Sequence, residues 1–126
     1  PKGFEPNLKV VERAKSLSKF GANILVSNNP IESSKDAQIL YTDVWASMGQ
    51  EDEQLKRKKI FEKYVVNEKL IEVAHKKVII LHCLPAHREE EITDDAIESN
   101  FSRVFDQAEN RLHIQQALLA AQLGGL

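Results

Sequence analysis

The only cysteine of the chain, Cys83, stands where a strand is expected to end. The apolar run Val78–Leu81 is typical of a buried strand, and His82-Cys83-Leu84-Pro85 follows it as the start of a loop. In open parallel sheets, ligands bind in the crevice beyond the carboxyl ends of the strands. This position therefore predicts a nucleophilic or polar thiol that is exposed to a ligand.

A second candidate strand upstream is followed by a comparable group of reactive side chains. The stretch Gln38–Thr42 favours a short strand, and the loop Asp43–Gln50 brings a carboxylate, an indole and a hydroxyl together with the turn-forming Gly49. Both strands are expected to end at the same edge of one sheet. The sequence thus predicts that Asp43 and Cys83 lie close together.

Taken singly, these residues also have simpler explanations. A lone cysteine after a strand is most often a small buried apolar residue, and Asp43 could be a turn or cap residue. Trp45 is expected to pack and shape its loop rather than to bind a ligand. His82 is expected to be a hydrogen-bonded structural residue. No second ligand pair stands at metal-site spacing from Cys83, so we predict neither a metal nor a cofactor.

Three separated motifs, in the same order, resemble the ornithine carbamoyltransferase family. The resemblance covers almost the whole chain and corresponds to the second, ornithine-binding half of that enzyme, without its opening strand and helix. It implies transfer of the carbamoyl group of carbamoyl phosphate to L-ornithine, which gives L-citrulline and phosphate in arginine metabolism. The motifs are Asp43-Val44-Trp45-Ala46-Ser47-Met48-Gly49, His82-Cys83-Leu84-Pro85 and Phe105-Asp106-Gln107-Ala108-Glu109-Asn110-Arg111-Leu112-His113.

The resemblance assigns roles residue by residue. Asp43 and Cys83 are the implied catalytic residues, and Asp43, Ser47 and Met48 are the implied ornithine-binding residues. By the same resemblance, Cys83, Leu84 and Arg111 contact carbamoyl phosphate; the planar donors of an arginine suit an oxyanion. In one departure, Glu89 stands where relatives commonly have glycine, so the turn after Arg88 is expected to differ.

The family's first domain has no counterpart in this sequence. Its Ser-Thr-Arg-Thr phosphate loop and its His-Pro-x-Gln segment are not found, and the chain begins without methionine. We therefore expect a piece that is inactive alone and that needs its missing N-terminal carbamoyl-phosphate domain and the family's homotrimer. Two alternatives stay open: a sister transcarbamylase for putrescine or N-acylated ornithine, and a non-catalytic, stand-alone binding domain.

Composition limits the other classes of function. The 126 residues predict one domain, and a 42% hydrophobic, 29% charged composition is ordinary for a soluble globular protein. No apolar run approaches the roughly 18 residues of a membrane span. The net charge of −2 argues against nucleic acid as a partner. A single cysteine cannot form an internal disulfide, and no secretory signal opens the chain, so a cytoplasmic location is expected.

The alternation of helical and strand patterns predicts an α/β fold. We expect a doubly wound, mostly parallel, Rossmann-like sheet with helices on both faces, formed by residues 1–126 as one partial domain. The predicted strands are 23–27, 38–42, 78–81 and 102–105. The predicted helices are 7–21, 30–35, 51–64, 67–75, a short one after Thr93, and 108–123.

Overall fold

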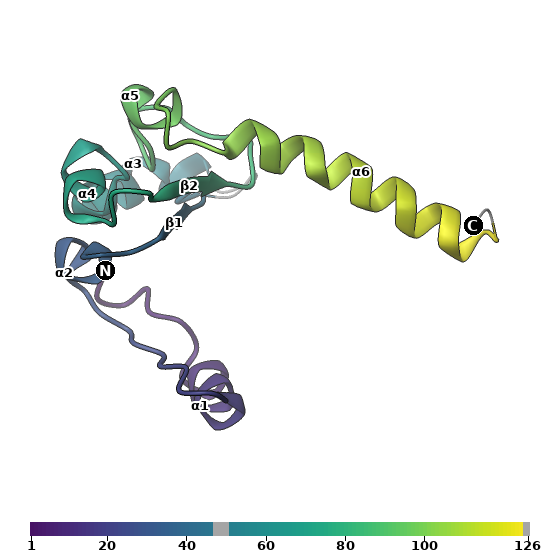
Figure 1. The fold of residues 1–126 in the computed structure, drawn as a ribbon. Coiled ribbons are helices and arrows are strands. Elements are labelled where there is room, and N and C mark those ends of the chain that lie inside the picture. Colours follow the sequence, from purple (N-terminus) through teal and green to yellow (C-terminus); the bar gives the residue numbers. More distant parts are fainter. Residues whose placement is uncertain (47–50, 125–126) are drawn as a thin grey trace.

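A computed structural model describes residues 1–46 and 51–124 of the chain (Figure 1). Two short strands lie at the centre, and the helices are arranged around and beyond them. In chain order the elements are α1 (Leu8–Leu17), α2 (Pro30–Ser34), β1 (Ile39–Thr42), α3 (Glu51–Phe61), the 3-10 turn η1 (Glu62–Tyr64), α4 (Glu68–Val73), β2 (Ile79–His82), α5 (Asp94–Ile97) and α6 (Val104–Gln122).

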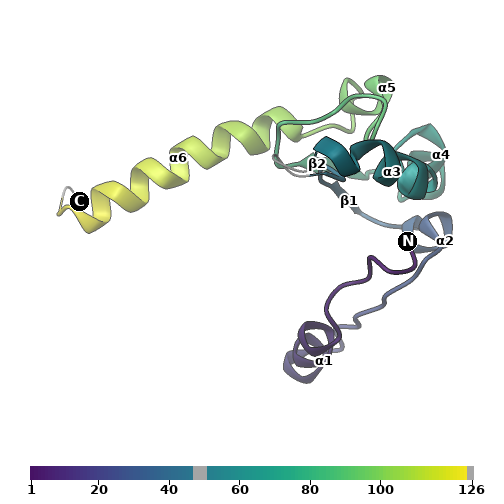
Figure 2. The same cartoon turned by 180° about the vertical axis from the view of Figure 1, so that it is seen from behind.

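The two strands pair in parallel. Their register joins Ile39 to Ile79 at one end and Thr42 to His82 at the other. Helix α3 lies behind β2 in Figure 1 and in front of it in Figure 2, so it lies on one side of the pair. A parallel pair of strands joined through helices is the α/β class that the sequence predicts.

A small apolar core surrounds β2. Ile80 is completely buried, and its backbone accepts a hydrogen bond from Arg103 N and donates one to Phe101 O, each of 2.9 Å. On another side, Val66 N donates to Glu91 O (2.9 Å), which attaches the segment before α4 to the segment before α5. The buried apolar side chains are Leu40, Val66, Leu70, Val78, Ile80, Ile92, Ala96, Ile97 and Val104.

Three helices begin at residues whose side chains cap them. Asn7 Oδ1 accepts from Lys9 N (3.0 Å) before α1, Asn67 Oδ1 from Leu70 N (3.2 Å) before α4, and Thr93 Oγ1 from Ala96 N (3.3 Å) before α5. Such side chains satisfy backbone N–H groups that have no partner in the first turn. The helix at the beginning of the chain ends at Leu17, earlier than the predicted stop near residue 21.

The predicted strand at 23–27 is wrong. In the described part of the chain these residues have no regular structure, and Leu25 and Val26 are exposed. A strand needs a neighbour for its backbone groups, and no described segment pairs with this one. The apolar pattern alone could not show that the neighbour was lacking.

The predicted strand at 102–105 is also wrong. Ser102 makes a single parallel bridge with Ile80, and α6 already begins at Val104. The last helix therefore starts earlier than the predicted residue 108. Val and Phe favour strands weakly, and here the helical continuation of the chain outweighs that preference.

Two helices extend away from the strands. Both α1 and α6 project from the body in Figures 1 and 2, and Val104 is the one buried residue of α6. Large apolar side chains are consequently exposed on these helices, which typically indicates a surface that contacts other protein. The exposed ones on α6 are Phe105, Leu112, Ile114, Leu118 and Leu119. Among the described helices, none combines the length and the apolar character that crossing a membrane requires.

The turn after Arg88 keeps a left-handed residue although it has no glycine. Glu89 has φ +62°, a conformation that glycine adopts without cost and that a residue with a Cβ adopts at about 1 kcal/mol or more. The Glu89 carboxylate accepts a 2.7 Å hydrogen bond from Asp94 N, the first residue of α5. This hydrogen bond attaches the turn to the beginning of α5.

Replacement of Glu89 should separate the cost of its left-handed conformation from the gain of its hydrogen bond to Asp94 N. Glu89→Ala and Glu89→Gly both lose the hydrogen bond to Asp94 N, but only the alanine variant keeps the left-handed strain. We expect the glycine variant to have the larger free energy of unfolding, by about 1 kcal/mol. Urea unfolding of the two variants measures the difference, and equal stabilities would contradict a strained Glu89.

Candidate active site

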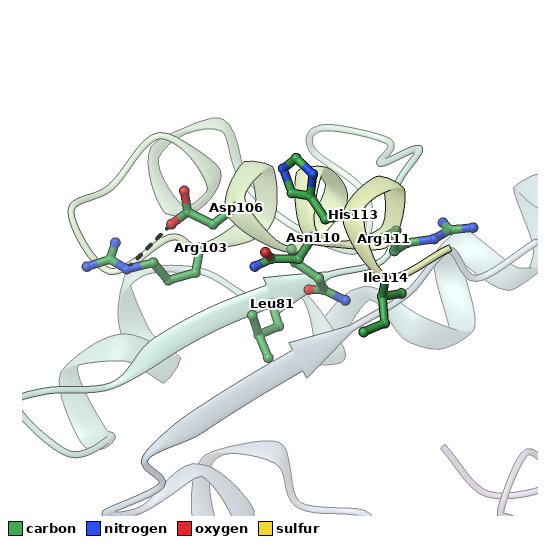
Figure 3. Close-up of a pocket in the computed structure, with 8 residues that line it drawn as sticks. Leu81, Arg103, Asp106, Asn110, Arg111, His113 and Ile114 are labelled. Atoms are coloured by element: carbon green, nitrogen blue, oxygen red, sulfur yellow. Dashed lines mark ion pairs between the residues drawn. The ribbon is translucent and has the colours of Figure 1, made fainter. Parts of the chain in front are cut away.

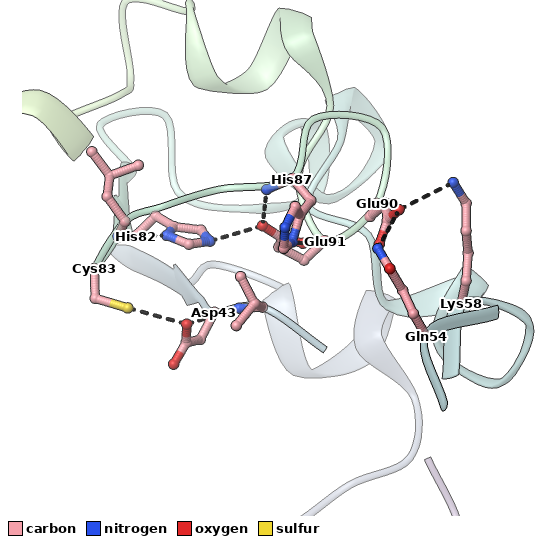
Figure 4. Close-up of polar contacts among 10 residues, drawn as sticks. Asp43, Gln54, Lys58, His82, Cys83, His87, Glu90 and Glu91 are labelled. Atoms are coloured by element: carbon pink, nitrogen blue, oxygen red, sulfur yellow. Dashed lines mark hydrogen bonds and ion pairs between the residues drawn. The ribbon is translucent and has the colours of Figure 1, made fainter. Parts of the chain in front are cut away.

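The carboxylate and the thiol predicted at the strand ends lie in contact. Because Thr42 pairs with His82, the next residue of each strand, Asp43 and Cys83, reaches the same edge of the sheet. Cys83 Sγ donates to Asp43 Oδ1 over 3.1 Å, and Val44 N donates to the same oxygen over 2.8 Å (Figure 4). The register of two short strands thus places a proton donor against an acceptor.

This contact keeps the thiol protonated. The hydrogen bond to Asp43 raises the pKa of the Cys83 thiol; burial and the negative charge of Asp43 raise it further. A backbone hydrogen bond at Cys83 and the positive charge of Arg111 oppose the rise without cancelling it. The thiolate is the nucleophilic form of cysteine, so near neutral pH Cys83 is a hydrogen-bond donor rather than a nucleophile.

The reactivity of Cys83 should report this environment. Since its pKa is raised, we expect alkylation by iodoacetamide to be slow at pH 8 and to reach half its maximal rate above the pH of an ordinary thiol. Asp43→Asn should move this profile to lower pH, because the negative charge is removed. The profile is site-specific because the chain has 1 cysteine. An unchanged profile in Asp43→Asn, or a shift of equal size in Asp36→Asn at the other end of β1, would contradict this cause.

Arg111 reaches the same loop from α6. Its Nη1 donates to the carbonyl oxygen of Cys83 over 3.2 Å. Because α6 begins at Val104, Arg111 lies about two turns inside the helix, deeper than the sequence predicted. The side chains of Cys83, Leu84 and Arg111, all expected from the sequence, line one open hollow.

A second hollow adjoins the first along α6. Its lining includes Leu81 of β2 and Asn110 and Arg111 of α6, and Figure 3 shows the Arg111 side chain extending away from Leu81. Arg111 is the one predicted site residue that lines it, and it lines both hollows. At its far end Arg103 forms an ion pair of 3.9 Å with Asp106. Arg111 thus borders both hollows.

Gln107 connects the helix to both strands, a role that the sequence did not single out. Its Oε1 accepts from His82 N over 3.1 Å, and its Nε2 donates to the hydroxyl of Tyr41 over 2.9 Å. These two hydrogen bonds fix the first turns of α6 against β1 and β2. Arg111 follows one turn later and is positioned by the same attachment.

His82 is the hydrogen-bonded structural residue that the sequence predicts. Both it and Glu91 are completely buried, and His82 Nε2 lies 3.0 Å from Glu91 Oε1 (Figure 4). Its Nδ1 accepts from Leu84 N over 2.9 Å. Glu91 was not predicted, because it ends a run of three glutamates that is typical of an exposed surface.

Trp45 of the Asp43–Gln50 loop packs against α3. Trp45 stacks on Phe61 with ring centroids 5.6 Å apart, and its carbonyl oxygen accepts from Arg57 Nη1 over 2.9 Å. The expectation that Trp45 packs against other side chains is confirmed. Ser47 and Met48, the other predicted ornithine-binding residues, lie outside the described residues.

Among the described residues, two groups of side chains bring potential metal ligands within 4.8 Å of one another. In the first, Asp43 and Cys83 join His82, whose two ring nitrogens already face Leu84 N and Glu91. In the second, His87 and Glu91 join Glu90, which already accepts from Gln54 Nε2 (3.3 Å) and pairs with Lys58 (3.5 Å). Each group would have to give up existing hydrogen bonds to hold a cation.

Comparison with known proteins places this geometry in context. The protein-family model for the aspartate/ornithine carbamoyltransferase Asp/Orn-binding domain matches residues 1–122. The ornithine carbamoyltransferase of a Prochlorococcus marinus strain is 67% identical over 126 residues, which are 100% of this chain and 40% of that protein. The chain thus spans well under half the length of this curated relative.

Solved structures of carbamoyltransferases are also similar to this chain. The crystal structure of ornithine carbamoyltransferase from Gloeobacter violaceus is 45% identical with a TM-score of 0.83, over 96% of this chain and 40% of that one. A structure of N-acetyl-L-ornithine transcarbamylase is more distant, at 28% identity and a TM-score of 0.63, over 75% of this chain and 29% of that one. Both likenesses support the α/β fold described above.

Proposed function

The chain belongs to the aspartate/ornithine carbamoyltransferase family, and we propose that it supplies the ornithine half-site of an ornithine carbamoyltransferase. The complete enzyme transfers the carbamoyl group of carbamoyl phosphate to L-ornithine and gives L-citrulline and phosphate. One observation carries the proposal: Asp43 and Cys83 meet at the carboxyl ends of paired strands, with Arg111 donating to the same loop.

The reaction needs an uncharged amine. The side-chain nitrogen of ornithine attacks the carbonyl carbon, a C–N bond forms, and the tetrahedral intermediate then breaks its C–O bond to release phosphate. The nitrogen loses a proton in the process. Groups that bind the substrate, orient it and accept or relay that proton are therefore the ones that the protein must provide.

Asp43 and Cys83 fit the proton-transfer part of this chemistry. In the proposal Asp43 binds the α-amino group of ornithine, since a carboxylate attracts an ammonium. Cys83 stays protonated beside it, because the hydrogen bond to Asp43 raises the pKa of the thiol. It acts as a donor and proton relay and forms no covalent intermediate.

Leu84 and Arg111 fit the carbamoyl phosphate part. The proposed contact of Arg111 with carbamoyl phosphate places a cation where negative charge increases as phosphate leaves. Leu84 helps to position the carbamoyl group from the same hollow. Ser47 and Met48 are proposed to contact ornithine, on the resemblance alone.

The proposed enzyme needs a further domain and further subunits besides this chain. The chain spans 40% of its curated relative, and α6 exposes large apolar side chains that a neighbouring domain or subunit would cover. We propose that an N-terminal carbamoyl-phosphate domain and a homotrimer complete the enzyme. A cytoplasmic location and a place in arginine metabolism belong to the same proposal.

A chimeric enzyme tests the choice of substrate. In it, this chain replaces the matching 40% of the Prochlorococcus marinus relative. Carbamoyl transfer is measured with L-ornithine, putrescine and N-acetyl-L-ornithine, and the unmodified relative is the control. We expect ornithine to have the highest kcat/KM. A preference for putrescine or N-acetylornithine would identify a sister transcarbamylase, and a folded chimera without transfer to any of the three would favour a non-catalytic binding domain.

A further inference from the structure

Glu91 is a buried carboxylate without a buried cation beside it. Its side chain and that of His82 are both 0% exposed. Among the described residues no lysine or arginine forms an ion pair with it. Burial of a carboxylate costs several kcal/mol unless hydrogen bonds compensate. The hydrogen bonds that Glu91 accepts therefore indicate what it does.

The hydrogen bond between His82 and Glu91 fixes the tautomer of His82. A backbone N–H can only donate, so the Nδ1 atom of His82 that faces Leu84 N must be an unprotonated acceptor. The ring is consequently neutral, with its proton on Nε2, and that proton is donated to Glu91 Oε1 over 3.0 Å. Glu91 selects the one tautomer of His82 that can hold Leu84 N.

The second hydrogen bond that Glu91 accepts holds the other end of the same loop. The same oxygen, Oε1, accepts from the backbone N of His87 over 2.6 Å. Between the two attachments lie Cys83 and Leu84, and Leu84 has φ +53°, a left-handed conformation that costs a leucine about 1 to 3 kcal/mol. A conformation of this kind persists when surrounding contacts impose it.

We propose that Glu91 is a positioning residue for the reaction: through His82 and His87 N it holds the loop 82–87 so that Cys83 faces Asp43. The inference rests on the proposed function, because Cys83 matters through its place in that site. Glu91 lines neither of the two hollows beside α6 and is itself completely buried. It acts through the geometry of the residues that do line them.

Substitutions that keep the volume but change the hydrogen bonds test this role. Glu91→Met removes both acceptors, whereas Glu91→Gln keeps an acceptor oxygen for His82 Nε2 and His87 N. The amide nitrogen of that glutamine would stand at the place of Oε2, which has no hydrogen-bond partner and lies 3.9 Å from His87 Nδ1. Glu90→Gln is the matched control, since Glu90 contacts Gln54 and Lys58 instead.

Two quantities are measured: kcat of the chimera and the pH profile of Cys83 alkylation. In the chimera, we expect Glu91→Met to lower kcat on the order of a hundredfold, as misplacement of reacting groups does, and Glu91→Gln and Glu90→Gln to stay close to the parent. In the chain itself, with circular dichroism as the check on folding, Glu91→Met should move the pH profile of Cys83 alkylation to lower pH, because the contact with Asp43 is lost. A purely structural role would lower stability and leave that profile unchanged.

The outcomes separate this inference from the proposed function. An inactive chimera rejects the proposed function, while the alkylation profile still decides the role of Glu91. If a folded Glu91→Met has the alkylation profile and kcat of the parent, the positioning role is wrong. If Glu91→Met does not fold, His82→Asn, which can still accept from Leu84 N, should keep the parent's profile, and His82→Gln, which cannot, should lose it. Identical profiles in those two variants would also overturn the inference.

Discussion

Asp43→Asn in the chimera should lower kcat/KM for L-ornithine by about 10² to 10⁴, the usual range for a lost acid or base group. Asparagine has nearly the same shape and can still accept from Cys83 Sγ and Val44 N. The substitution therefore removes the charge and leaves the local geometry. Both proposed roles of Asp43, binding of the α-amino group and proton transfer, depend on that charge.

The control for this result is Asp36→Asn. Asp36 is exposed and precedes β1, at the opposite end from Asp43. Its replacement should leave the rate of citrulline formation unchanged. Equal activity of Asp43→Asn and the parent would remove Asp43 from the catalytic residues, and the contact with Cys83 would then be structural.

Arg111→Lys should lower kcat/KM for carbamoyl phosphate on the order of a hundredfold. A lysine keeps the charge but cannot present the planar, directional donors that suit an oxyanion. It would also lose the hydrogen bond from Nη1 to Cys83 O. We expect the effect to be larger at low than at saturating carbamoyl phosphate, because the contact is made with that substrate.

Arg103→Lys, at the residue that precedes the same helix, is the matched control. Arg103 stands just before α6 and pairs with Asp106, away from Cys83. Arg103→Lys should alter neither kcat nor KM for carbamoyl phosphate. If the two lysine variants behave alike, Arg111 is an ordinary surface cation of the helix.

The part of the site that could be predicted is the part that depends on local pattern. A buried apolar run predicted β2, a shorter one predicted β1, and a parallel pair ends at one edge whatever else the fold contains. The meeting of Asp43 with Cys83 follows from those two facts. The beginnings of the helices at Asn7, Asn67 and Thr93 could likewise be predicted, because each capping side chain acts within its own turn.

The features that were missed depend on distant partners. Residues 23–27 have the composition of a strand, but no described neighbour supplies their hydrogen bonds. Glu91 has the composition of a surface, yet it is buried because His82 and the backbone of His87 converge on it. Neither the apolar pattern of 23–27 nor the run of glutamates before Ile92 shows these outcomes, since tertiary contacts override local preference.

The proposed half-site is tested most directly by comparing citrulline formation by this chain alone and by the chimera, with equal amounts of L-ornithine and carbamoyl phosphate. We expect no turnover by the chain alone and turnover by the chimera that is lost in Cys83→Ala. Turnover by the chain alone would show that it holds a complete carbamoyl phosphate site. A folded, trimeric chimera that forms no citrulline would contradict the claim that Asp43, Cys83 and Arg111 form the ornithine half of this active site.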